Sequence, residues 1–81
     1  MPTVFLHEGY RFFFFSNEGS PREPIHVHVR KGGASAKFWL DPSIRLAEAY
    51  GFTSTELKDL EGAVNHHEQS IRSRWHEHFG E

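Results

Sequence analysis

The sequence predicts one small α+β domain, in which an antiparallel sheet of about four strands carries helices on one face. Three observations predict this class. Residues 3–40 form short β-branched and aromatic runs separated by turn residues, which is typical of strands. Residues 53–80 repeat apolar residues at spacings of three and four, which is typical of an amphipathic helix. The chain has 81 residues and no cysteine, which fits a single domain over residues 1–81 and excludes disulfide and thiol chemistry.

Four runs are expected to form the sheet. Their ranges are Thr3–Leu6, Tyr10–Phe15, Ile25–Lys31 and Ala34–Leu40. The second run is aromatic, with Arg11 as its one polar side chain, so we expect it to be covered on both faces. Gly32-Gly33 between the last two runs is a signal for a two-residue hairpin turn.

The Gly32-Gly33 turn predicts which side chains of the hairpin are neighbours. With these glycines in the turn, His28 opposes Lys37 across the two strands. Because side chains alternate along a strand, the apolar residues point to one face and the polar residues to the other. The polar face, expected to lie away from the long helix, would carry His26, His28, Arg30, Lys37 and Trp39.

Two helices are expected after the strands. A short helix over Pro42–Tyr50 would be capped by Asp41. A long helix would begin after Thr53, which forms a capping box with Glu56, and would end at Gly80. Its buried stripe would consist of Leu57, Leu60, Val64, Ile71, Trp75 and Phe79.

The net charge is −2, and it is unevenly distributed. Residues 1–40 carry five Lys/Arg against three Asp/Glu, whereas residues 41–81 carry four against eight. Nucleic-acid-binding domains are usually basic, so only the N-terminal half is expected to present a positive surface. The sequence shows neither a signal peptide nor an apolar run of about 20 residues, so we expect a cytoplasmic protein without membrane contact.

His26 and His28 are the main candidates for chemistry. Two strand residues two positions apart share a face, about 6–7 Å from each other. The two imidazoles would act as general acid and general base on an RNA phosphodiester without a metal, and Lys37 would stabilise the phosphate. The alternatives are a metal site at the same two histidines and a face that only docks a protein. Substrate binding is assigned to Arg30, Trp39 and Arg11.

Two further groups have a chemical and a structural interpretation. Glu18, in Ser16-Asn17-Glu18, would be a general base or orient a histidine, but Ser and Asn also favour turns by bonding their own backbone. The aromatic run Phe12–Phe15 would either stack bases or fill the core. The histidines of the long helix lack the four-residue spacing of a helical zinc site and are expected to be solvated: His66, His67, His76 and His78.

Several short motifs occur in an order that resembles one bacterial family. They are Pro2-Thr3-Val4-Phe5, Gly9-Tyr10-Arg11-Phe12-Phe13-Phe14, Ser16-Asn17-Glu18, Pro24-Ile25-His26-Val27-His28-Val29 and Ala36-Lys37-Phe38-Trp39-Leu40. From Pro2 to about Phe79 the chain resembles domain-of-unknown-function family 4160. The resemblance implies the toxin of a toxin–antitoxin pair, encoded beside a second small protein. It supplies no established catalytic residues.

The leading hypothesis is therefore a toxin-like protein that acts on RNA and is held in check by a small cognate partner. The alternatives are a non-catalytic interaction module and a metal-binding protein that uses His26, His28 and Glu18. The expected partners are that cognate protein, RNA and a second copy of the chain. No cofactor is expected.

Overall fold

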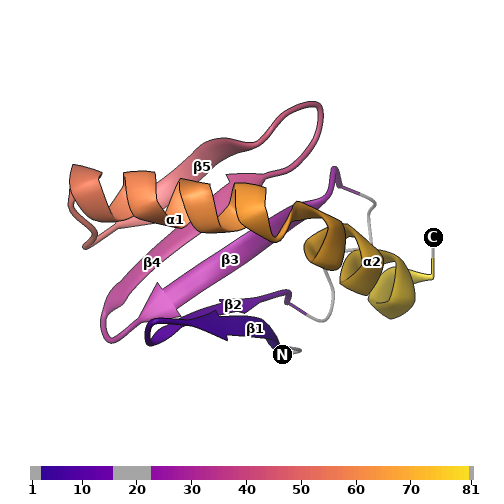
Figure 1. Ribbon diagram of the computed structural model, residues 1–81, viewed down its shortest axis with the longest axis horizontal. Coiled ribbons are helices and arrows are strands. Elements are labelled where there is room, and N and C mark those ends of the chain that lie inside the picture. Colours follow the sequence, from indigo (N-terminus) through magenta and orange to yellow (C-terminus); the bar gives the residue numbers. More distant parts are fainter. Residues whose placement is uncertain (1–2, 16–22, 81) are drawn as a thin grey trace.

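A sheet of five antiparallel strands and a layer of two helices make up the protein in the computed structural model, which describes residues 3–15 and 23–80 (Figure 1). The strands are β1 (Thr3–His7), β2 (Tyr10–Phe13), β3 (His26–Lys31), β4 (Ala34–Trp39) and β5 (Arg45–Tyr50). The helices are α1 (Ser54–His66) and α2 (Glu68–Phe79). The strands lie side by side in chain order. Figure 1 shows both helices on one side of the sheet, which confirms the predicted α+β class.

The β3–β4 hairpin has the predicted register. Lys31 pairs with Ala34 across the turn, and His28 pairs with Lys37 further along. Gly32 has a φ angle of +58°, in the left-handed region that residues with a side chain rarely adopt. The local turn signal was therefore sufficient to place the two functional candidates next to each other.

The segment before Gly51 is a strand, so the prediction of a short helix over Pro42–Tyr50 is wrong. β5 pairs along the edge of β4, from Arg45 opposite Trp39 to Tyr50 opposite Ser35. Leu, Ala and Glu in this segment favour a helix in isolation. A strand, however, satisfies the backbone N–H and C=O groups along the edge of β4, and this tertiary pairing overrides the local propensity.

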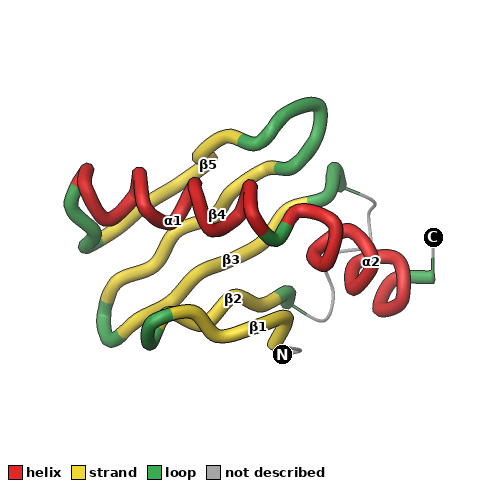
Figure 2. Tube along the Cα trace, viewed as in Figure 1, coloured by secondary structure: helices red, strands yellow, loops and turns green. Residues whose placement is uncertain are grey.

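The predicted long helix is instead two helices that meet at His67 (Figure 2). The capping box is confirmed, because the Thr53 hydroxyl accepts a hydrogen bond from the Glu56 N–H at 3.1 Å and the Glu56 carboxylate accepts one from the Thr53 N–H at 2.8 Å. Gly80 ends α2 with a φ angle of +73°. No helix within residues 3–15 and 23–80 is long and apolar enough to cross a membrane.

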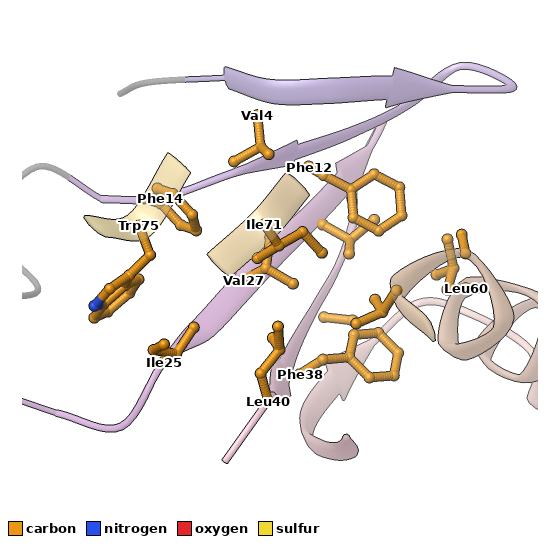
Figure 3. Packing of buried hydrophobic residues seen from close by; sticks show 14 residues of the cluster. Val4, Phe12, Phe14, Ile25, Val27, Phe38, Leu40, Leu60, Ile71 and Trp75 are labelled. Atoms are coloured by element: carbon orange, nitrogen blue, oxygen red, sulfur yellow. The ribbon is translucent and has the colours of Figure 1, made fainter. Parts of the chain in front are cut away.

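The hydrophobic core lies between the helices and the sheet (Figure 3). Leu60 of α1 and Trp75 of α2 are almost completely buried against residues from β2, β3 and β4. The Trp75 ring lies 5.3 Å from the Phe14 ring and 4.3 Å from the Phe79 ring, measured between centroids. The predicted helical stripe is confirmed, with Leu57 and Phe79 only partly buried at its two ends.

Arg72 links α2 to the residues that directly follow β4. One guanidinium nitrogen lies 2.9 Å from Asp41 Oδ1 and donates to the Leu40 carbonyl at 3.1 Å, while Nε donates to Glu68 at 2.9 Å. The bond to Asp41 raises the pKa of Arg72 above its ordinary value. Asp41 therefore does not cap a helix after β4, as the sequence suggested, but holds the second helix in place.

His67, the histidine between the two helices, should make the free energy of unfolding depend on pH. Burial lowers the pKa of His67 below its ordinary value, and the nearby His66 and His7 lower it further. The unfolded chain then binds a proton more readily than the folded chain, so the free energy of unfolding should fall as the pH drops below about 6.5. Above that range both states hold a neutral imidazole and the effect vanishes.

Denaturant unfolding at about pH 8 and about pH 5.5 measures this dependence. His67→Gln should flatten the decrease in stability, because it removes the partly buried imidazole. His76→Gln, at an exposed position of α2, is the matched control for loss of one histidine. The same decrease in His67→Gln and in the wild type would contradict the assignment to His67.

Candidate nucleic-acid interface

The sheet face opposite α1 and α2 gathers most of the polar side chains that the sequence pattern selected. We call it the open face. Its first row across the strands, the His28 row, consists of Phe13, His28, Lys37 and Glu48. Its second row, the Arg30 row, consists of Arg11, Arg30, Ser35 and Tyr50. Trp39 and Arg45 lie opposite each other and continue the face on β4 and β5.

A shift in the β4–β5 register gives the open face two charges from β5. Arg45 pairs with Trp39 and Glu48 pairs with Lys37, with the irregularity between these two pairs. Arg45 and Glu48 are three positions apart and would point to opposite faces of a regular strand. The extra residue of the bulge places both on the open face.

A pocket of about 250 Å³ lies on the open face. Its walls include residues of both rows: Phe13, His28, Arg30, Ser35, Lys37, Glu48 and Tyr50. Four neighbouring strands therefore contribute side chains to one hollow. Cationic, anionic and aromatic groups all reach it.

His28 and Lys37 lie side by side on the open face, as predicted, and both line this pocket. His28 is partly exposed, and its ring lies 4.5 Å from the Phe15 ring between centroids. Lys37 Nζ lies 3.6 Å from Glu23 Oε1 and 4.3 Å from the centroid of the Trp39 ring. The His28 imidazole and the Lys37 ammonium group are thus neighbours, and the Glu23 carboxylate forms an ion pair with the ammonium group.

His26 is not accessible, although the sequence placed it with His28 on an open polar face. Its side chain is fully buried, and its ring lies 5.3 Å from Trp39, 5.1 Å from Trp75 and 5.3 Å from His28. Its Nδ1 donates to the Pro24 carbonyl at 2.9 Å, and its Nε2 is buried. The expectation of a solvent-facing histidine pair is wrong, because two tryptophans enclose the first histidine. In this position His26 can orient His28 but cannot touch a ligand on the face.

Phe13 brings two cations together beside the pocket. The Cζ atoms of Arg11 and Arg30 lie 4.8 Å and 5.6 Å from the centroid of its ring. The two arginines are direct neighbours across β2 and β3. Like charges so placed repel, and their cation–π contacts with Phe13 offset the repulsion. Phe13 itself is buried by these neighbouring side chains, although neither α1 nor α2 lies over this face of the sheet.

Comparison with known proteins identifies the family. The family model described as Domain of unknown function (DUF4160) matches residues 9–76. The chain belongs to this family. No curated protein and no solved structure gives a significant match to the chain. The matched range runs from the start of β2 into α2 and so includes both rows of the open face.

The structure adds three residues to the candidate site of this DUF4160 domain. Glu48 and Tyr50 were missed because their segment was predicted as a helix, and Ser35 because its small side chain gives no signal of its own beside the charged and aromatic residues of the polar face. A strand prediction for 45–50, paired to β4, would have placed Glu48 and Tyr50 on the polar face. Glu18 lies outside the described residues, so its role stays a prediction.

Metal ligation has little to support it in the described part of the chain. Within residues 3–15 and 23–80, no three His, Asp or Glu side chains come close enough together to hold one metal ion. His26 uses its Nδ1 for the Pro24 carbonyl, and aromatic rings surround it. The alternative of a metal at His26 and His28 thus lacks a third ligand from these residues.

The distribution of acidic residues favours binding of anions on the open face. Five of the eight Asp/Glu of residues 41–81 lie on α1 and α2: Glu56, Asp59, Glu61, Glu68 and Glu77. These helices cover the other face of the sheet (Figure 1). The acidic C-terminal half therefore places most of its negative charge away from the open face, where Arg30, Lys37 and Arg45 lie.

Proposed function

We propose that this protein is a toxin-like RNA-binding protein that holds a single-stranded segment on the open face. The observation that carries the proposal is the mixing of cations and aromatic rings around one pocket. Arg30 and Lys37 supply positive charge and Tyr50 supplies a ring face in the pocket. The Trp39 ring lies next to it, 4.3 Å from Lys37 Nζ. Proteins that bind single strands combine these two features, because phosphates need cations and bases stack on rings.

Lys37 is the residue we assign to a phosphate. Its ammonium is already close to the Glu23 carboxylate at 3.6 Å, and the contact is only partly exposed. An incoming phosphate would replace this carboxylate and gain a charge-assisted hydrogen bond. Glu23 then competes with RNA for the same lysine.

Cleavage of the bound strand would use two groups of the His28 row. Within this row Lys37 stands between His28 on β3 and Glu48 on β5. Neighbouring strands are about 4.8 Å apart, so an imidazole and a carboxylate flank the cation at similar distances. Glu48 would accept the proton of a ribose 2′-hydroxyl as its oxygen attacks the phosphorus. The imidazolium form of His28 would give a proton to the departing 5′-oxygen, leaving a 2′,3′-cyclic phosphate and a 5′-hydroxyl.

Binding of a labelled single-stranded RNA, followed by fluorescence anisotropy, tests the proposed function. Lys37→Ala should weaken binding and lower the slope of log K against log salt by about 0.7, the value for one lost phosphate contact on a single strand. Glu23→Gln should strengthen binding, because the competing carboxylate is gone. Lys58→Ala, at an exposed site on α1, should change neither quantity.

The exposed residues of β5 favour a second candidate function, docking of a cognate partner protein. Leu46 and Tyr50 are 40% and 74% exposed on a strand at the edge of the sheet. Edge strands offer unpaired backbone groups to another chain. If the wild type binds no RNA in the anisotropy experiment, RNA binding is wrong and this docking function takes its place.

A further inference from the structure

The Arg30 row crosses the open face beside the His28 row. Its central side chain is shorter than the side chains on either side of it. Ser35 stands between Arg30 of β3 and Tyr50 of β5. Arg30 and Tyr50 carry long side chains, and Tyr50 is 74% exposed, whereas Ser35 ends at a hydroxyl. All three residues line the pocket of about 250 Å³. The row thus forms a slot with a guanidinium on one wall, an aromatic ring on the other and a small residue as its floor.

We infer that this slot is a subsite for one nucleobase of the bound RNA, and that it prefers a purine. The inference rests on the proposed function. Bases stack on aromatic rings and on guanidinium planes, and Tyr50 and Arg30 offer one of each. Stacking grows with the area of the rings in contact, so a two-ring base gains more than a one-ring base. The pocket is smaller than the ~300–1,000 Å³ of sites for drug-sized ligands, which fits a single base.

The spacing of the two rows connects this subsite to the phosphate. Residues two positions apart on a strand are separated by about 6–7 Å, which is the distance between the Arg30 row and the His28 row. A nucleotide with its base over Ser35 therefore has its ribose and phosphate within reach of Lys37. The base subsite would set which nucleotide stands beside His28 and Glu48.

A single-stranded RNA with 2′-fluoro riboses, which resists cleavage, tests the subsite. It carries one 2-aminopurine among uridines, and its partner carries an abasic residue at the same place. The 2-aminopurine fluorescence should be quenched on binding to the wild type, because the base stacks. The abasic RNA should bind about 5- to 150-fold more weakly, the range for loss of one stacked base.

Two variants remove the subsite by different means. Tyr50→Ala removes a wall at an exposed position, and Ser35→Leu fills the floor. In both, quenching should disappear and the two RNAs should bind equally. Ser73→Leu, at an exposed position of α2, should behave as the wild type, and circular dichroism checks the fold of each variant.

The possible results separate this inference from the proposed function. If the two RNAs bind the wild type equally well, or if both variants still quench 2-aminopurine, the base subsite is wrong while RNA binding through phosphates stands. If neither RNA binds at all, the proposed function fails and the subsite with it. Equal affinity for single purines and pyrimidines at that position would overturn the purine preference.

Discussion

Replacing Trp75 with alanine should lower the free energy of unfolding by about 3–5 kcal/mol. The indole is completely buried, and its ring centroid lies 5.3 Å from Phe14, 5.1 Å from His26 and 4.3 Å from Phe79. Its loss would leave a cavity where α2 meets the sheet (Figure 3). A domain of this length has only about 4–12 kcal/mol of stability, so the variant should lose a large share of it and unfold at a much lower denaturant concentration.

Two matched variants make the result interpretable. Trp75→Phe keeps most of the ring volume and removes an indole N–H that is buried without a hydrogen-bond partner among the described residues, so it should be much milder than the alanine variant. His76→Ala changes the next residue, which is exposed, and should have little effect. Denaturant unfolding followed by circular dichroism gives the midpoints. A midpoint for Trp75→Ala equal to that of the wild type would rule out its place in the core.

Local signals were enough to predict the hairpin and the ends of the helical region. The alternation around Gly32-Gly33 decides which residues pair, because a slip by one residue would turn every apolar side chain to the wrong face. Thr53 and Glu56 likewise lie within one turn of each other and form their bonds without help from the rest of the chain. Gly80 adopts a backbone conformation that glycine favours.

Long-range contacts explain what the sequence pattern did not predict. Residues 45–50 contain good helix formers, and only the edge of β4 makes them a strand. Glu48 and Tyr50 reached the open face as a consequence. His26 has the alternation of an open-face residue, but Trp75, distant in sequence, closes over it. Alternation along a strand predicts the face to which a side chain points. Whether other residues bury that side chain depends on the rest of the fold.

Substitution of either proton-transfer residue, His28 or Glu48, should have the largest effect on the proposed RNA cleavage. A placed proton-transfer group typically contributes about 10²–10⁴-fold, so His28→Ala and Glu48→Gln should each lower the rate by that order. Lys37→Ala should also lower it, because the charge that develops on the phosphate loses its cation. Cleavage of a labelled RNA by the purified variants measures the rates, and a chelator should leave the wild-type rate unchanged.

His26→Ala tests the buried histidine that would position His28, whereas His28→Ala tests the proposed catalytic acid itself. Because His26 is buried among Trp39, Trp75 and His28, this variant should lose stability, whereas His28→Ala, at a partly exposed position, should stay folded.

In cells, expression of the wild type alone should stop growth, and a neighbouring partner gene should relieve the arrest. The His28→Ala variant, present at the same level, should be harmless. If His28→Ala cleaves RNA or arrests growth as well as the wild type, His28 is not the catalytic acid. If the wild type cleaves no RNA, the open face is a binding surface alone.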